Sequence, residues 1–267
     1  MGNRNLAGTQ EQISRRQVLA GAGTLAAGAM LGQGCGMVSP KRAAGGSTEK
    51  WPWPYKKLDP EKTAELCYAE WYRVFCGAVI SSVFLQLREL VGEPYISFPA
   101  DGFAYFEGGQ MGWGTICGAP AGANLVANLI IGPRIIGKSA AGHQIATEMM
   151  EWYSQTELPV YVPKKPKVTA KLPVTVSSSP LCHISVGRWM KEANKPLASP
   201  ERQDRCARVA ASTAYRLIEL LNAWKDGSYE ADSKFDCINQ HGIPGQFNCA
   251  DCHSSGAPAV TKEEPET

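Results

Sequence analysis

The stretch 248-NCADCHSSG-256 places Cys249, Cys252 and His253 in a C-x-x-C-H pattern near the end of the chain. The surrounding segment, residues 228–258, is polar and loop-like and contains few apolar side chains. Burial of apolar surface is the main offset to the entropy lost when a chain becomes ordered. This end of the chain can therefore fold stably only if it gains apolar contacts from something bound to it.

Three kinds of chemistry use two cysteines at this spacing. A zinc site would need a second pair of ligands at structural spacing, and the sequence has none. A catalytic dithiol would not need the adjacent histidine. Covalent haem attachment uses all three residues: the thiols bond to the vinyl groups and the histidine ligates the iron. We therefore expect haem c at Cys249 and Cys252, with His253 as an axial ligand.

The histidine census limits how many haems the chain can hold. A haem ligated by two histidines uses two of the four, and two such haems use all four. The four histidines are His143, His183, His241 and His253. His143 follows Gly142 on an expected helix and is either a distal ligand or an ordinary core histidine.

Two other places resemble weakened attachment motifs. In 179-SPLCH-183 the pair Cys182-His183 is kept, and in 237-CINQH-241 Gln240 stands where the second cysteine would be. Cys182 is the better candidate to attach a second haem through one thioether bond, and Cys237 is the weaker. The alternative for each is a surface histidine beside a buried thiol.

The N-terminus has the pattern of an export signal. Arg15 and Arg16 in 14-SRRQVLA-20 precede a short Gly/Ala-rich apolar run, residues 18–32, too short and glycine-rich for a stable transmembrane helix. The setting resembles a twin-arginine signal, so we expect a periplasmic protein. The alternative is a chance arginine pair before an apolar helix. Cys35 is a candidate lipid anchor.

Hydrophobic periodicity predicts a mainly α fold. Helices are expected over 60–90 with a break near Cys76-Gly77, and over 119–131, 139–156, 181–193 and 200–224. Asp59-Pro60 and Ser199-Pro200 are helix starts. Between them, residues 159–180 alternate prolines and β-branched residues with lysines, so we expect an extended linker with a short strand pair.

These patterns divide the chain into six parts. They are an export signal (1–35), a tether (36–58) that docks around Trp51 and Trp53, a helical domain (59–158), an extended linker (159–180), a haem-binding region (181–258) and a disordered tail (259–267). The haem-binding region contains one long helix and a loop-rich C-terminal segment. The formal net charge of +2 and the lack of a basic stripe with interleaved aromatics exclude nucleic-acid binding.

Four of the nine cysteines fall in apolar helical surroundings: Cys67, Cys76, Cys117 and Cys206. Such cysteines usually pack as small hydrophobic residues. Small neighbours follow Cys76 and Cys117, so the backbone can approach closely there. An iron–sulfur cluster or a disulfide is therefore the alternative to inert packing.

The order of these motifs resembles a known family. The stretch 108-GGQMGWGTICGAPAGA-123, preceded by Cys76, is similar to the family named for its C-GCAxxG-C-C cysteine pattern. With 178-SSPLCHISVGRW-189, 206-CARVAASTAYRLIELLN-222 and 242-GIPGQFNCADCH-253, residues 60–256 resemble its split-Soret cytochrome c branch. The resemblance implies a mainly helical homodimer with bis-histidine haems near the dimer contact, and an iron–sulfur site made from the helical cysteines. The chain departs from the pattern in having one full attachment motif, and Cys-Gly-Ala-Val where Gly-Cys-Ala is expected.

The leading interpretation is an exported electron carrier whose haem has both axial positions filled. Its partners would be periplasmic or membrane-associated redox proteins. One alternative is a periplasmic haem oxidoreductase acting on a small oxidant, which needs an open axial position. Another is a zinc or dithiol redox module that uses the C-x-x-C-H. We expect an electron carrier rather than an enzyme.

Overall fold

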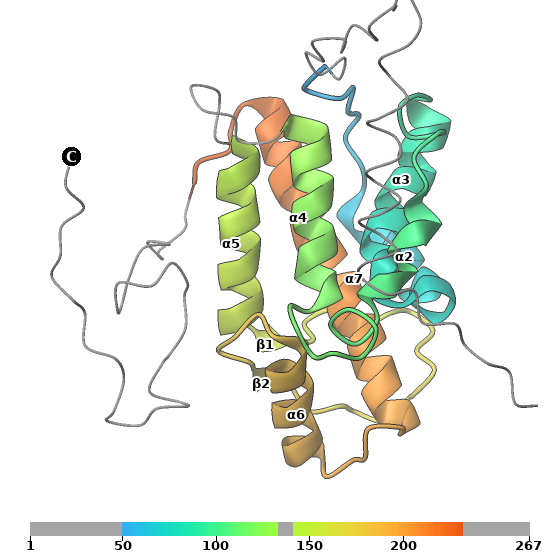
Figure 1. The fold of residues 1–267 in the computed structure, drawn as a ribbon, viewed down its shortest axis with the longest axis vertical. Coiled ribbons are helices and arrows are strands. Elements are labelled where there is room, and N and C mark those ends of the chain that lie inside the picture. The colour runs from blue at the N-terminus through green and yellow to red at the C-terminus, as the bar shows by residue number, and fades with distance from the viewer. Residues whose placement is uncertain (1–49, 133–140, 232–267) are drawn as a thin grey trace, which may run out of the picture. The chain divides into compact units, whose positions relative to one another are not determined.

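Helices make up most of the residues that the computed structural model describes, which are residues 50–132 and 141–231 (Figure 1). The expected fold class, mainly α, is confirmed. The loop-rich C-terminal segment, the export signal and Cys35 lie outside the described residues. In residues 50–132 and 141–231, no helix is long and apolar enough to cross a membrane.

Two helices begin where the capping residues predict. Asp59 accepts hydrogen bonds from the backbone of Glu61 and Lys62 and starts α2 (Pro60–Val74). Ser199 accepts one from Arg202 and starts α7 (Pro200–Asp226), which ends at Gly227 in the left-handed conformation with φ of 73°. The side-chain acceptor at the N-cap satisfies helix-end donors that have no internal partner, and proline in the first turn lacks an N–H that would otherwise be unpaired.

The predicted break at Cys76 is present. A 3₁₀ turn, η1 (Phe75–Gly77), separates α2 from α3 (Ala78–Leu90). Phe75 has φ of 49°, so the chain cannot continue as a regular helix there. The break allows η2 (Ala100–Phe106) to pack against η1.

The helix α7 is the centre of the core. It packs against α2, α3, α4 (Gly118–Ile131) and α5 (Ala141–Gln155), as Figure 1 shows. The buried side chains include Ile80, Leu87 and Leu217, each fully enclosed. Each such side chain contributes about 1.5–3 kcal/mol by leaving water, so buried residues of both α3 and α7 stabilise the bundle.

The end of the predicted tether is packed onto this bundle. Trp51 Nε1 donates to the carbonyl of Leu129 at 3.0 Å, and Trp53 N donates to Ile130 O at 2.7 Å. The Trp53 ring meets Tyr95 edge-on, with centroids 5.6 Å apart.

The expected strand pair is short. β1 (Glu157–Leu158) pairs antiparallel with β2 (Thr175–Val176), and α6 (Cys182–Ala193) follows. The segment between the strands is extended, with exposed lysines at 164, 165, 167 and 171. Its backbone is nevertheless bound to the bundle, because Arg208 donates to Val168 O and Tyr68 Oη accepts from Lys167 N at 2.7 Å.

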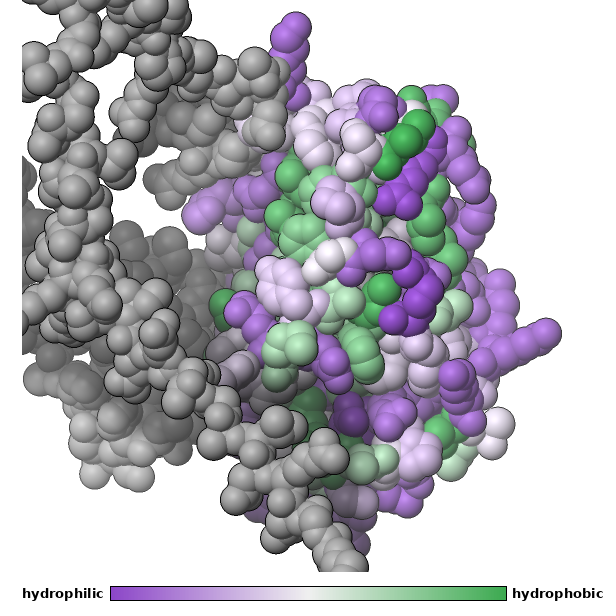
Figure 2. Space-filling model, turned by 45° about the vertical axis from the view of Figure 1, so that its right-hand side comes forward, coloured by the Kyte–Doolittle hydropathy of each residue, from purple (hydrophilic) through white to green (hydrophobic). Residues whose placement is uncertain are grey.

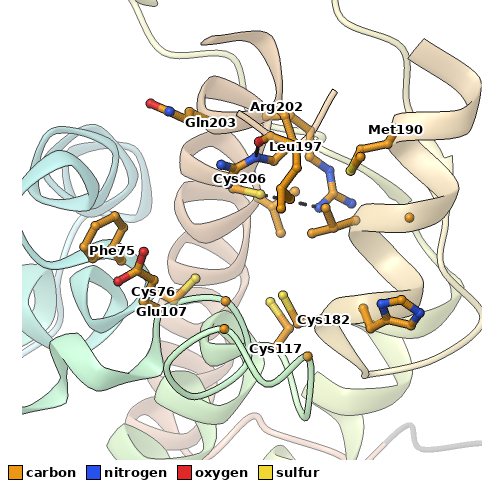
Figure 3. A pocket seen from close by; sticks show the side chains of 18 of the residues that line it. Phe75, Cys76, Glu107, Cys117, Cys182, Met190, Leu197, Arg202, Gln203 and Cys206 are labelled. Atoms are coloured by element: carbon orange, nitrogen blue, oxygen red, sulfur yellow. Dashed lines mark hydrogen bonds between the residues drawn. The ribbon is translucent and has the colours of Figure 1, made fainter. Parts of the chain in front are cut away.

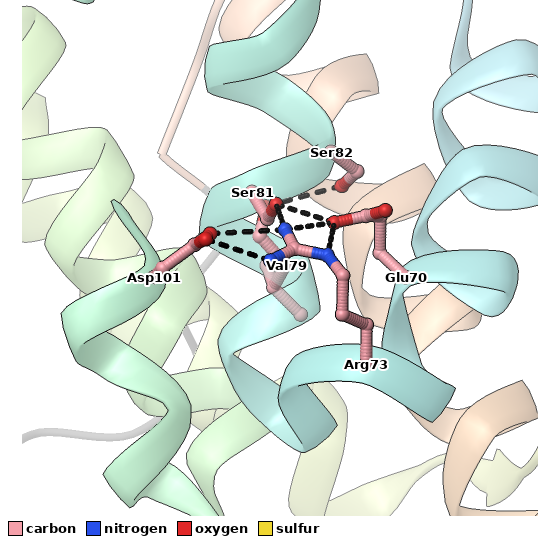
Figure 4. Close-up of polar contacts among 6 residues, drawn as sticks. All are labelled: Glu70, Arg73, Val79, Ser81, Ser82 and Asp101. Atoms are coloured by element: carbon pink, nitrogen blue, oxygen red, sulfur yellow. Dashed lines mark hydrogen bonds and ion pairs between the residues drawn. The ribbon is translucent and has the colours of Figure 1, made fainter. Parts of the chain in front are cut away.

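A polar cluster fastens η2 beside the helix break. Arg73, in the last turn of α2, donates to both carboxylate oxygens of Asp101, at 2.7 and 2.9 Å, and also pairs with Glu70 (Figure 4). Ser81 of α3 donates to Glu70 at 2.8 Å. Hydrogen bonding from Arg73 lowers the pKa of Asp101. The cluster therefore joins α2, α3 and η2 close to Cys76.

Candidate metal centre

A cavity of about 790 Å³ lies between the helix break, the glycine-rich loop after η2, α6 and the first turns of α7. Four cysteines line it, each from a different segment (Figure 3): Cys76, Cys117, Cys182 and Cys206. We call this space the cysteine cavity. All four cysteines are free thiols.

Backbone hydrogen bonds bring Cys117 and Cys182 together. Cys117 N donates to Pro180 O at 2.8 Å, and Cys182 N donates to Thr115 O at 2.7 Å. Between these bonds Ile116 and Leu181 form an antiparallel bridge. The two thiols are therefore neighbours because their segments are paired, although they are far apart in sequence.

Glycine is required where the loop passes the cysteines. Gly109 has φ of +69°, and a Cβ there would lie 2.8 Å from the Cβ of Cys182. A Cβ on Gly118 would lie 2.7 Å from the Cβ of Cys76 and 2.4 Å from Phe106 O. Real Cβ atoms do not approach so closely, so Gly118 permits the close backbone approach predicted after Cys117, and Gly109 permits a further one.

The thiols are electrostatically unequal. Hydrogen bonds from Cys182 and Cys76 lower the pKa of Cys117 well below its usual range. The same hydrogen bonds to Cys117, together with burial, raise the pKa values of Cys76 and Cys182. Cys117 is therefore the thiol that most readily becomes a thiolate, the form that binds metals.

Two hydrogen-bond donors at the cysteine cavity have no partner. Trp71 Nε1 and Arg205 Nε are buried and unbonded in the described part of the chain, and both residues line the cavity. Leaving a buried donor unsatisfied costs about 1–3 kcal/mol, so such atoms are uncommon in folded proteins.

No group of three or more His, Cys, Asp or Glu within residues 50–132 and 141–231 is arranged to hold a metal ion. The four thiols therefore surround a space instead of converging on one point. That donor set fits a centre of several atoms better than a bare ion.

The structure separates the predicted site residues into groups. Cys182 lies with Cys76, Cys117 and Cys206, whereas Cys67 is fully buried away from the cavity and hydrogen-bonds with Ser82. His183 lines the cavity and is exposed. His143 is not among the residues that line the cavity. It lies near the start of α5, ten residues and so about 15 Å along the helix from Tyr153. Five predicted residues lie outside the described ranges: Cys237, His241, Cys249, Cys252 and His253.

Thiols from four separate segments around one cavity are typical of metal-binding or redox-active proteins. A family model described as "Putative redox-active protein (C_GCAxxG_C_C)" matches residues 76–220. The chain belongs to this family.

A full-length relative and a solved structure agree with this assignment. The chain is 32% identical over 281 residues to the split-Soret cytochrome c of Desulfovibrio desulfuricans, covering 94% of this chain and 98% of the relative. A solved structure of the split-Soret cytochrome c from this species, reported for a novel iron centre, matches with a TM-score of 0.64 and 30% identity. It covers 79% of this chain and 86% of the solved one. The expected resemblance is confirmed.

One signal in the sequence could have identified Cys182 as a cavity cysteine. The matched range, 76–220, contains four cysteines in the order that the family pattern gives, and Cys182 is the third. Cys67 falls before that range. Arg205 was also missed, because the helical pattern alone does not show that a charged residue beside Cys206 is buried.

Proposed function

We propose that the protein is an exported electron carrier with covalently attached haem and a separate iron centre. Haem c would be attached at Cys249 and Cys252, with His253 as an axial ligand, as the C-x-x-C-H predicts. The similarity over 94% of the chain to a split-Soret cytochrome c supports this assignment.

The iron centre is proposed for the cysteine cavity. The observation that carries it is the gathering of Cys76, Cys117, Cys182 and Cys206 around one space. Soft thiolate ligands favour iron in sulfur coordination. Haem and iron, when bound, supply one-electron transfer between ferrous and ferric states. The protein's residues hold them, set their charge environment and limit access by water.

This assignment changes the proposed role of Cys182. Its thiol lies beside Cys117 in the cysteine cavity, so we assign it to the iron centre in preference to a second haem. His183 is exposed at the cavity edge and can serve as an axial ligand to a haem at the surface. His241 and His143 remain the other proposed ligands, and Cys237 a weaker attachment residue.

The cellular setting follows from the sequence. We propose export by the twin-arginine route to the periplasm, with periplasmic or membrane-associated redox proteins as partners. A homodimer is proposed from the family resemblance. On the face drawn in Figure 2, apolar side chains (green) lie between hydrophilic ones (purple). Exposed large apolar residues of the described chain include Trp113 and Met111.

The test is a count of both kinds of iron. A pyridine haemochrome spectrum gives haem per chain, and total iron minus haem iron gives the second centre. Cys249→Ser with Cys252→Ser should abolish covalent haem and leave the second centre. Cys117→Ser should remove the non-haem iron and keep the haem, whereas Cys67→Ser, a buried thiol outside the cavity, should keep both.

The haem assignment and the iron-centre assignment can each be overturned by a separate result. Absence of covalent haem in the wild-type protein would overturn the cytochrome assignment. Equal loss of non-haem iron in the Cys67 and Cys117 variants would overturn the cavity assignment. Binding of carbon monoxide to the reduced haem would show an open axial position and favour the oxidoreductase.

A further inference from the structure

The side chain of Arg205 lies at the cysteine cavity with its charge removed from water. It is 1% exposed and lines the cavity together with Cys206, the next residue in the chain. No carboxylate in residues 50–132 or 141–231 forms an ion pair with it. Other buried or partly buried arginines do have such partners: Arg208 pairs with Asp204 at 2.6 Å and Arg216 with Glu148 at 2.8 Å.

The hydrogen bonds of Arg205 hold its side chain at the cavity without neutralising it. Nη2 donates to Ser185 Oγ at 2.8 Å, and Tyr153 Oη donates to the same oxygen at 2.9 Å. Nη1 lies 3.9 Å from Cys206 Sγ, and Nε has no partner. Ser185 and Tyr153 are fully buried, so three helices fix the guanidinium in place.

An isolated buried cation is expensive, and a structure retains one where a negative charge faces it. Besides Glu107, Arg202 and His183, the ionisable groups that line the cavity with Arg205 are the four thiols, which must lose their protons to bind a metal. Four thiolates carry more negative charge than the iron centre they would hold carries positive charge. The loaded centre is therefore an anion, and Arg205 is the cation that matches it.

We propose that Arg205 is a positioning residue that offsets the negative charge of the iron centre and raises its reduction potential. This inference rests on the proposed iron centre. Reduction adds one electron to the centre and makes it more negative, so a fixed cation stabilises the reduced form more than the oxidised form. In the iron-free protein the same cation lacks its partner and costs stability.

The experiment compares four variants of the full, haem-containing chain. Arg205→Gln keeps amide donors for Ser185 and removes the charge, Arg205→Met removes both, and Arg205→Lys keeps the charge. The control is Arg216→Gln, which makes the same change on the same helix at an arginine already paired with a carboxylate. Potentiometric titration with dithionite, followed by the electron paramagnetic resonance of the non-haem iron, gives the potential. Urea unfolding gives stability before and after removal of non-haem iron by chelation.

We expect the neutral variants to shift the reduction equilibrium toward the oxidised form by at least tenfold, about 59 mV for one electron. Arg205→Lys should recover most of this shift, and Arg216→Gln should change the equilibrium less than twofold. Arg205→Met should destabilise the iron-loaded protein and leave the iron-free protein as stable as wild type or more so. If one neutral variant does not fold, the other neutral variant and the lysine variant still give the direction of the shift in reduction potential.

Two results would overturn the inference: a potential in the neutral variants equal to that of the control, or equal destabilisation of the loaded and iron-free forms. The second pattern would mean that Arg205 is purely structural. Absence of non-haem iron in wild type is a different failure, since it would remove the proposed centre itself.

Discussion

Asp204 accepts the hydrogen bonds of a buried polar network, and the loss in free energy of unfolding when its charge is removed can be predicted. The side chain is fully buried in α7 and accepts from Arg208 Nε at 2.7 Å, from Tyr72 Oη at 2.9 Å and from Tyr68 Oη. Arg208 is 5% exposed, and its other acceptor is the carbonyl of Val168. Asp204→Asn keeps the shape and an acceptor for the tyrosines but leaves this cation without its counter-charge.

We expect Asp204→Asn to lower the free energy of unfolding by about 3–5 kcal/mol, the cost of breaking a buried ion pair from one side. The double variant Asp204→Asn with Arg208→Met removes both charges, and neutral replacement of a buried pair is far less costly. The double variant should therefore be more stable than the sum of the single changes, with a coupling of about 2 kcal/mol. The exposed pair of Lys57 with Asp226 is the control, since Asp226→Asn should cost less than about 0.5 kcal/mol.

The assay is urea unfolding of the mature protein followed by far-ultraviolet circular dichroism, with equal slopes required for comparison. A cost for Asp204→Asn no larger than that of the exposed control would contradict the reasoning. So would a double variant whose loss equals the sum of the two single losses. Either result would mean that water or another group reaches Arg208 in the folded protein.

Two further changes test the packing and the capping. Gly118→Ala should destabilise the fold and reduce non-haem iron, because the new Cβ would meet Phe106 O and the Cβ of Cys76. The control is Gly187→Ala on α6, where no atom lies within 4 Å of the new Cβ, so this change should be neutral or stabilising by about 0.5–1 kcal/mol. Thermal unfolding and iron analysis of both variants would show whether the new contact matters more than the loss of glycine. Asp59→Ala should cost about 1 kcal/mol by removing the acceptor for Glu61 N and Lys62 N, and Asp59→Ser should restore most of it; equal stability of the alanine and serine variants in urea would contradict the capping role.

Helix boundaries were predictable because their causes are local. Asp59, Ser199 and Gly227 act on the backbone a few residues away, and the small residues after Cys76 marked the break between α2 and α3. Short-range chemistry of this kind can be identified without knowledge of the rest of the fold.

The composition of the cysteine cavity was not predictable in the same way. Cys182 reaches Cys117 through the pairing of Ile116 with Leu181, a contact between distant segments that no local pattern indicates. The fixed course of residues 159–180 also depends on remote partners, since Arg208 binds Val168 O and Tyr68 binds Lys167 N. Periodicity predicted that α7 has a buried face, but not that Arg205 and Asp204 would be enclosed with it.

The backbone pairing that joins the segments of Cys117 and Cys182 has a consequence for how a metal is acquired. Because main-chain hydrogen bonds hold the two segments in register, their ordering entropy is lost during folding and need not be lost again on ligation. If the proposed iron centre forms there, this preorganised pair of thiols accepts iron after the chain has folded, so that metal loading and folding become separate steps in the maturation of the protein.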